Sequence, residues 1–177
     1  MARPVLDAPA DGGSPAIAIR RATESDLPAI VEIYNQGVED GVASCDLSGT
    51  DVEGKREWLA AHTDPHAVWV AEQDGLVVGW ICLSPYDPKP CFAKTGTLST
   101  YVRRGYRRLG AATRLREHLV AEARRRAFHT LVNRVWITNE ASIEMSRKFG
   151  WKQVGHMKDL VHKDGAFFDC LFFQYDL

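Results

Sequence analysis

The stretch VRRGYRRLGAATRL, residues 102–115, decides how this chain folds and what it can bind. It follows a segment that alternates like a strand, residues 95–102, and it opens a helix that apolar spacing predicts over residues 107–126. Gly110 and Ala112 let a ligand approach the start of that helix, where unpaired N–H groups and the helix dipole favour an anion. The stretch therefore predicts an anion cradle. It is neither a P-loop nor a dinucleotide fingerprint, because Gly-Lys-Ser/Thr and G-x-G-x-x-G are both absent from it.

Positive charge is concentrated in the same region. The chain has 177 residues, with 22 Lys+Arg against 23 Asp+Glu and a formal net charge of -1. Residues 103–126 hold nine arginines and two glutamates, a local charge of +7, so the rest of the chain carries -8. The neutral total argues against a broad nucleic-acid surface, whereas a compact polyphosphate suits one basic helix terminus. We expect the arginines from 114 to 126 on the solvated face of the helix, and Arg107 and Arg108, within residues 107–112, at the ligand.

The remaining pattern predicts one α/β domain, of mixed α+β type, over residues 16–177 after a flexible tail at residues 1–15. Asp74-Gly75 and Asp164-Gly165 are hairpin signals. The predicted strands lie at 17–21, 67–71, 76–83, 95–102, 131–138 and, as a pair, within 151–177; the predicted helices begin at 23–26, at 50 or 51, at 107 and at 139.

Two further features restrict the class of protein. No apolar run approaches the ~20 residues of a membrane span, and the N-terminus lacks the apolar region of a signal peptide, so we expect a cytoplasmic protein with no membrane partner. Cys45, Cys82, Cys91 and Cys170 form no C-x-x-C pair and have no metal-ligand spacing with the histidines, so we expect no metal. Cys82 and Cys170 lie in apolar runs and are predicted core residues.

Two motifs carry a resemblance to a known family. Arg107-x-x-Gly110-x-Ala112 resembles the R/Q-x-x-G-x-G/A acyl-CoA signature of the GNAT superfamily of N-acetyltransferases. NEASIEMSRKFGW, residues 139–151, resembles the next motif of that superfamily, an Asn followed by a helix that ends in Gly-aromatic. The resemblance to its phosphinothricin acetyltransferase-like branch covers residues 16–177 and includes EIYNQGV (32–38), GWICLSPY (79–86), STYV (99–102) and the segment from Gly165 to Asp169. It implies a GNAT-like domain with a central, mixed, mostly antiparallel twisted sheet flanked by helices.

The resemblance also implies acetyl-CoA as the cosubstrate. The backbone of Thr100, Tyr101 and Val102 would pair with the pantetheine arm, and Asn139 would bond to the cofactor near the thioester. Asn139 is a good helix cap with or without a ligand. The pyrophosphate would be held by Arg108, Leu109, Gly110, Ala111, Ala112 and Thr113, and Arg107, the first residue of the signature, would also bind the cofactor.

The catalytic positions of the branch hold unusual residues here. The branch usually places a glutamate where this chain has Thr97, and a histidine or tyrosine where it has Ser146. Neither side chain is a competent base near neutral pH, although the acceptor amine must lose a proton before it attacks the thioester. The candidates for that role are Tyr34, His162 and Asp169. An active transferase is the favoured interpretation, and an acyl-CoA-binding sensor or partner module without catalysis is the alternative; a nucleic-acid module is a third.

The acceptor is the least defined part of the prediction. Lys89 and Phe92 stand where the branch tends to carry an arginine and a tyrosine that meet an acidic amino-acid analogue. Together with Tyr34 they predict a site for a small amine with an acidic group, and a peptide or protein amine is the alternative. The branch often forms homodimers, so the apolar run 167–173 suits either a core strand or an interface.

Overall fold

The computed structural model describes residues 16–41, 46 and 48–177. Over this part of the chain, seven strands form one sheet in the order β1-β2-β3-β4-β5-β7-β6. The strands are β1 (Ala18–Arg21), β2 (Ala67–Gln73), β3 (Leu76–Pro85), β4 (Thr95–Val102), β5 (Thr130–Trp136), β6 (Lys152–Lys163) and β7 (Ala166–Asp176). The helices are α1 (Leu27–Glu39), α2 (Val52–Ala61), α3 (Ala111–Arg125) and α4 (Glu140–Lys148), with short 3-10 turns at Glu24–Asp26, Pro90–Phe92 and Arg104–Tyr106.

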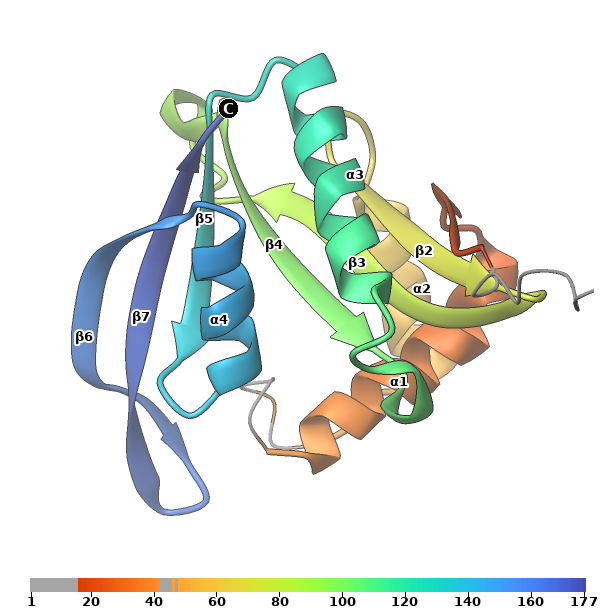
Figure 1. The fold of residues 1–177 in the computed structure, drawn as a ribbon, viewed down its shortest axis with the longest axis horizontal. Coiled ribbons are helices and arrows are strands. Elements are labelled where there is room, and N and C mark those ends of the chain that lie inside the picture. The colour runs from red at the N-terminus through yellow and green to blue at the C-terminus, as the bar shows by residue number, and fades with distance from the viewer. Residues whose placement is uncertain (1–15, 42–45, 47) are drawn as a thin grey trace, which may run out of the picture.

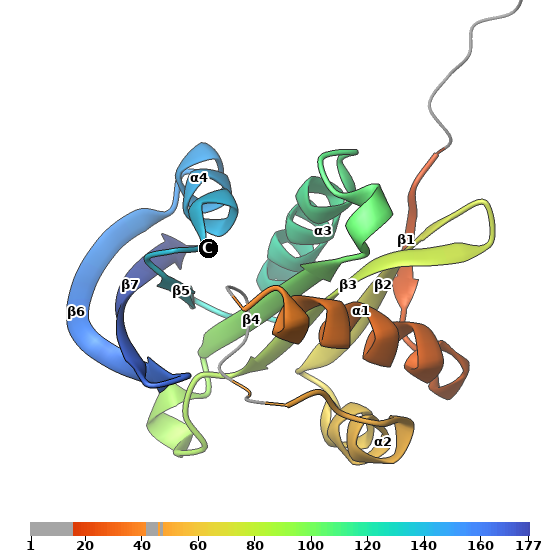
Figure 2. The ribbon, with the colours of Figure 1, turned by 90° about the horizontal axis from the view of Figure 1, so that it is seen from below.

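The sheet separates two helical layers. Helices α3 and α4 cover one face, and α1 and α2 cover the other (Figures 1 and 2). Because side chains alternate along a strand, neighbouring residues of β2 and β3 enter different cores. Trp69 and Ile81 pack under α3, whereas Val70 and Trp80 pack under α1 and α2. The predicted class, a mixed and mostly antiparallel sheet with helices on both sides, is confirmed.

The sheet divides at β4 and β5, which are its only parallel neighbours. Their pairing runs from Thr95↔Thr130 to Thr97↔Val132 and then stops, although β4 continues to Val102 and β5 to Trp136. Beyond Thr97, therefore, no strand of the described residues pairs with the edge of β4 that faces β5. The two strands diverge toward their carboxyl ends, where α3 and α4 begin (Figure 1). Ligands of open α/β sheets bind at such carboxyl ends.

Two expectations are corrected by the structure, and two others fall on residues that it does not describe. Helix α3 begins at Ala111 and not at Arg107, because Gly110 has φ +91°, a left-handed conformation that no helix continues through. Arg116 was expected on the solvated helix face but is only 3% exposed. The predicted tail at residues 1–15 and Cys45 fall outside the described residues, whereas the predicted burial of Cys82 and Cys170 is confirmed.

Within residues 16–41, 46 and 48–177, no helix is both long and apolar enough to cross a bilayer. In the same residues, no group of three or more His, Cys, Asp or Glu side chains is arranged to hold a metal ion.

Candidate active site

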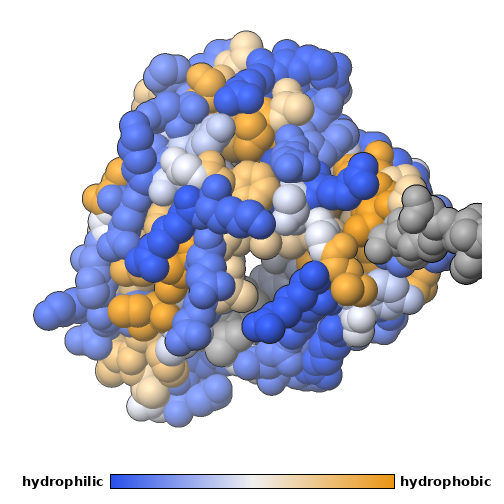
Figure 3. All heavy atoms as spheres, viewed as in Figure 1, coloured by the Kyte–Doolittle hydropathy of each residue, from blue (hydrophilic) through white to orange (hydrophobic). Residues whose placement is uncertain are grey.

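The diverging segment of β4 presents unsatisfied polar groups. Leu98 and Thr100 of β4 face α3. Their register partners on β3 are Leu83 and Ile81, which belong to the core under α3. The buried Oγ1 of Thr100 has no hydrogen-bond partner among the described residues. Figure 3 shows the surface hollowed between α3 and α4, over this part of β4. A buried hydroxyl and a free strand edge beside a hollow suit an extended ligand with its own amide groups.

The N-terminus of α3 forms the second part of this face. Gly110 precedes the helix, and a Cβ at this position would meet nothing within 4 Å. Glycine has no capping side chain, so the N–H groups of the first turn are available to an anion. This geometry fits the phosphates of acetyl-CoA at Ala111, Ala112 and Thr113.

Most arginines before α3 are already paired with acidic residues of α1 and its C-terminus. Arg104 and Arg107 each donate to Asp40, at 2.7 and 2.6 Å, and Arg103 forms an ion pair with Glu32. These guanidinium groups keep the pKa of Asp40 below its usual value, against the opposing effect of its partial burial. Arg107, the first residue of the signature, therefore joins the loop before α3 to α1.

Two arginines of this region remain for a ligand. Arg108 has φ +63° and an exposed side chain, and neither Arg108 nor Arg114 has an ion pair among the described residues. Three acidic residues, Glu32, Glu39 and Asp40, therefore offset part of the local charge of +7, and Arg108 and Arg114 are the cationic groups next to the α3 N-terminus.

Helix α4 borders the other side of the hollow. Asn139 caps it, its side chain accepting from the N–H of Ser142 at 3.1 Å. Ser146 is completely buried, and its hydroxyl donates to the carbonyl of Ser142 at 2.8 Å. Arg116 Nη1 and Asn133 Nδ2 lie 3.3 and 3.4 Å from the hydroxyl oxygen of Ser146. Ser146 therefore belongs to a buried polar cluster between α3, α4 and β5, made of Arg116, Asn133 and Ser146.

The opposite face of β4 carries an aromatic cluster. Tyr101 stacks on Trp80 with ring centroids 4.7 Å apart and meets the ring of Tyr34 at 5.3 Å. Lys55 of α2 places its ammonium 3.9 Å from the centroid of the Tyr34 ring and 4.6 Å from that of Trp58. Burial lowers the pKa of Lys55. The Tyr34 hydroxyl donates to Asp46, so Tyr34 is held on both sides.

Thr97 lies on this same face, opposite Ser84 in the β3–β4 register. The hydroxyl of Ser84 is 2.9 Å from Nε2 of His62, and Nδ1 of His62 is 2.7 Å from the carbonyl oxygen of Trp58. Because a carbonyl only accepts, Nδ1 carries the proton and Nε2 is the lone-pair nitrogen that faces Ser84. Burial lowers the pKa of His62, which favours this neutral form.

The other predicted residues lie farther from the divergence. His162, near the tip of the β6–β7 hairpin, is exposed and packs on Phe167 at 4.7 Å. Asp169 is a partly exposed carboxylate that bonds to His156 Nε2 at 2.6 Å and accepts from the N–H of Asp159 at 3.0 Å, which together lower its pKa. Lys89 and Phe92 lie on the exposed loop between β3 and β4, at the amino end of β4.

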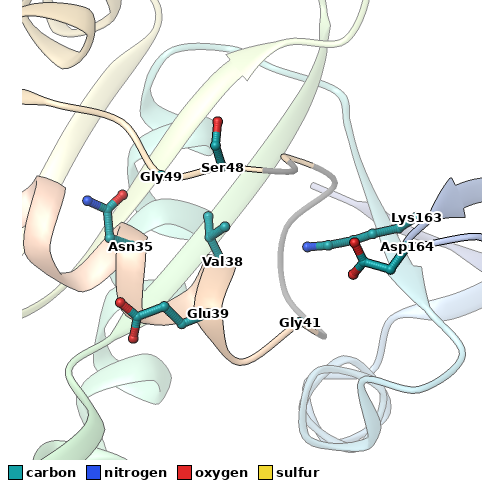
Figure 4. Close-up of a pocket in the computed structure, with 8 residues that line it drawn as sticks. All are labelled: Asn35, Val38, Glu39, Gly41, Ser48, Gly49, Lys163 and Asp164. Atoms are coloured by element: carbon teal, nitrogen blue, oxygen red, sulfur yellow. The ribbon is translucent and has the colours of Figure 1, made fainter.

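A pocket opens between α1 and the β6–β7 hairpin, with a volume of about 360 Å³ (Figure 4). Lys163 points from the hairpin toward α1, and its ammonium lies 5.7 Å from the ring of Trp136, the last residue of β5. On the other wall, Asn35 and Val38 neighbour Tyr34, which contacts β4 through Tyr101. The pocket thus lies between α1, whose Tyr34 contacts the carboxyl-terminal part of β4, and the hairpin, whose Lys163 contacts the end of β5. Its lining is Asn35, Val38, Glu39, Gly41, Ser48, Gly49, Lys163 and Asp164.

Comparison with known proteins identifies the family. Residues 29–151 match the Acetyltransferase (GNAT) family. An L-methionine sulfoximine/L-methionine sulfone acetyltransferase of Pseudomonas aeruginosa is 30% identical over 162 residues, which cover 90% of this chain and 94% of the relative. The phosphinothricin N-acetyltransferase of Streptomyces coelicolor is 25% identical over 169 residues, 93% of this chain and 99% of the relative.

Two solved acetyltransferase structures are similar to this chain over most of its length. A ribosomal-protein-alanine N-acetyltransferase from Brucella melitensis has a TM-score of 0.87 and 37% identity, covering 90% of this chain and 99% of that one. The yncA acetyltransferase of Salmonella typhimurium, solved with its cofactor acetyl-CoA, has a TM-score of 0.88 and 29% identity, covering 92% and 94%.

The chain therefore belongs to the acetyltransferase (GNAT) family. It is an N-acetyltransferase that uses acetyl-CoA as its cosubstrate.

The sequence pattern missed three features of this site. Lys55 lies on α2, which has weak apolar periodicity, and His62 follows its last residue. Only the packing of α2 on β3 brings Lys55 to Trp80 and His62 to Ser84. Arg116 looked like one arginine among many. Arg116 directly follows the buried Leu115, and it contacts Ser146 of α4. Its place next to a core residue was the one signal in the sequence that could have indicated its burial.

Proposed function

We propose that this enzyme acetylates the primary amine of a small amino-acid-like molecule. The carrying observation is the pocket between α1 and the β6–β7 hairpin, which offers both signs of charge: Lys163 and Asp164 on the hairpin side and Glu39 on the α1 side. An amino acid presents a carboxylate and an ammonium, so a pocket with both signs complements it. The names of the methionine sulfoximine and phosphinothricin acetyltransferases support the same class of acceptor.

Acetyl-CoA would occupy the α3 side of the divergence. The backbone of Thr100, Tyr101 and Val102 would pair with the pantetheine arm, and Asn139 would border the thioester. The first turn of α3, with Arg108 and Leu109 before it, would hold the pyrophosphate. Arg107 would act indirectly, by fixing the loop to Asp40. When bound, acetyl-CoA supplies the activated acetyl group.

The acceptor must lose a proton before it attacks, because an ammonium has no lone pair. We propose that His62 accepts this proton through the hydroxyl of Ser84, next to Thr97. The lowered pKa of His62 keeps Nε2 available as a base near neutral pH. In this arrangement Thr97 would only border the reacting groups, and Tyr34 would shape the acceptor side.

A peptide amine is the second candidate acceptor, supported by the resemblance to the ribosomal-protein-alanine N-acetyltransferase. A cytoplasmic location and a homodimer complete the proposal, and light scattering would measure the mass in solution. An acyl-CoA sensor and a nucleic-acid module are the competing functions.

Thiol release from acetyl-CoA tests the function. We expect turnover with L-methionine sulfoximine or phosphinothricin and little with a peptide that begins with alanine. Binding of acetyl-CoA without turnover on any amine would favour the sensor, and turnover restricted to the peptide would favour the second acceptor.

Two matched turns test the pocket. Asp164 and Asp74 both have φ 51° in an Asp-Gly hairpin turn, but only Asp164 lines the pocket. Asp164→Asn should raise KM for the amino-acid acceptor, whereas Asp74→Asn should leave it unchanged. Equal KM values would place the acceptor elsewhere.

A pH profile tests the proton route. We expect the rate of the wild type to fall as the pH drops through the lowered pKa of His62, because protonated His62 cannot accept a proton. His62→Gln should be slower and should lack this fall. An unchanged profile in the variant would exclude His62.

A further inference from the structure

Arg116 is a buried cation without an anionic partner. Its side chain lies between α3 and α4, and the residue is 3% exposed. Its Nη1 group is 3.3 Å from the hydroxyl oxygen of Ser146, but its Nε has no acceptor among the described residues. Asn133, the other member of the buried polar cluster, contributes an amide donor and no negative charge there. No carboxylate of the described residues forms an ion pair with Arg116, in contrast to the arginines before α3.

Such a residue is expensive to keep in a folded protein. A buried charge needs a partner of opposite sign, and an apolar residue of similar size is often more stable at the same position. Burial lowers the pKa of Arg116 to about 10, which expresses the same penalty. The guanidinium nevertheless remains protonated near neutral pH. An anion next to the guanidinium would offset this penalty of burying an unpaired charge.

The position of Arg116 indicates where that anion forms. Asn133 is the first residue of β5 after its last pair with β4, Thr97↔Val132, so the cluster borders the closed end of the divergence. Arg116 follows Gly110 by six residues, about 9 Å along a helix axis. Thr100 Oγ1, the other unsatisfied group on this face, belongs to the facing strand. A cofactor with its phosphates at the α3 N-terminus would extend its thioester end inward, toward this cluster.

Aminolysis of a thioester generates an anion at its sulfur. The amine nitrogen bonds to the carbonyl carbon, the carbon–sulfur bond breaks, and its electron pair remains on sulfur. Attack leaves a second proton on the nitrogen, which His62 accepts after it has passed the first proton to solvent. Negative charge develops first on the carbonyl oxygen and then on sulfur, and the thiolate is the charge that remains on the cofactor after the acetyl group has left. A fixed cation beside the sulfur lowers the barrier to that departure.

We propose that Arg116 is a catalytic residue that stabilises the departing CoA thiolate by direct charge pairing, held in place by Ser146. This proposal rests on the acetyltransferase function and on the placement of the cofactor on the α3 side. Arg116 keeps its own proton, and the thiolate takes one from water after release.

The ionisation of CoA bound to the enzyme tests the proposal without turnover. The ultraviolet absorbance of the thiolate, followed against pH, gives the pKa of the bound thiol. A cation within reach lowers the pKa of an acidic group by about 1 to 3 units. We expect a shift of that size in the wild type, none in Arg116→Met, and a partial shift in Arg116→Lys. An unshifted thiol pKa in the wild-type complex would overturn the proposal, whether or not the variants fold.

Desulfo-CoA distinguishes the thiolate from other anions. If Arg116 pairs with sulfur, wild type and Arg116→Met should bind desulfo-CoA equally well. Weaker binding of desulfo-CoA by Arg116→Met would assign Arg116 to a phosphate and overturn the proposal. Failure of the wild type to bind acetyl-CoA would instead contradict the function itself.

The stability of the free enzyme gives an independent readout. Arg116→Met should melt at or above the temperature of the wild type, because it removes a buried unpaired charge. Melting well below the wild type would show that Arg116 is a structural residue whose charge is already satisfied.

Discussion

Substitution of Gly110 separates backbone strain from electrostatics in the phosphate cradle. Gly110 has φ +91° and ψ -10°, and a Cβ there would meet nothing within 4 Å. Gly110→Ala and Gly110→Glu therefore share one cost, a left-handed backbone penalty of about 1–2 kcal/mol, and neither clashes. For a chain of this length, each kcal/mol corresponds to roughly 2–4 °C in Tm. Both variants should fold and melt a few degrees below the wild type.

The carboxylate of Gly110→Glu then acts in opposite directions on folding and on binding. At a helix N-terminus it stabilises the fold by about 0.3–1 kcal/mol, so the Glu variant should melt no lower than the Ala variant. Against a phosphate about 4 Å away it costs about 1 kcal/mol in water and about 4 kcal/mol at an effective dielectric constant of ~20. The Kd for acetyl-CoA should therefore be higher in the Glu variant than in the Ala variant, by roughly fivefold to several hundredfold.

Isothermal titration calorimetry with acetyl-CoA and a thermal melt of each variant are the assays. Equal affinities in Gly110→Ala and Gly110→Glu would refute the reasoning, because the added carboxylate would then be far from the phosphates. Loss of affinity in both variants to the same extent would assign the effect to backbone geometry alone.

Three further predictions follow from local geometry. Asn139→Ala and Asp51→Ala should each cost about 1 kcal/mol as lost helix caps, but only Asn139→Ala should weaken acetyl-CoA binding by calorimetry; equal binding would remove Asn139 from the site. Gly96→Ala places a Cβ 2.6 Å from Leu83 Cδ1 where β4 still pairs with β5, so it should cost about 1–3 kcal/mol in denaturant unfolding, whereas Gly105→Ala, with nothing within 4 Å, should cost far less. Burial lowers the pKa values of His62, His66 and His118, so the unfolded chain binds more protons than the folded protein. The stability of the fold should therefore decrease as the pH drops through about 6.5, the pKa of histidine in the unfolded chain. A melting temperature that rises with acidification would contradict this.

Local patterns were enough to predict the order of elements, and they place the proposed anion cradle at the start of α3. Each of these depends on residues close together in sequence: the Asp-Gly turns, the apolar spacing of α3, and Gly110 before it. The start of α3 was misplaced because Arg107 to Leu109 suit a helix by composition, and only the left-handed backbone of Gly110 excludes one.

Residues that act across the sheet could not be predicted in the same way. The pairing of Arg107 with Asp40 joins positions 67 residues apart, and it ties the loop before α3 to the end of α1. The approach of His62 to Ser84 depends on where α2 packs, which its own sequence does not determine. Arg116 has the composition of a solvated helix face, and its burial arises only because α4 covers that position.

Mass spectrometry of the acceptor most directly tests the central claim, that this chain transfers acetyl from acetyl-CoA to a small amine. L-methionine sulfoximine incubated with the enzyme and acetyl-CoA should gain one acetyl group per thiol released, and it should gain none when acetyl-CoA is omitted. Thiol release without an acetylated amine would show hydrolysis instead of transfer. Saturable acetyl-CoA binding with no acetylated product from any small amine or peptide would contradict the account.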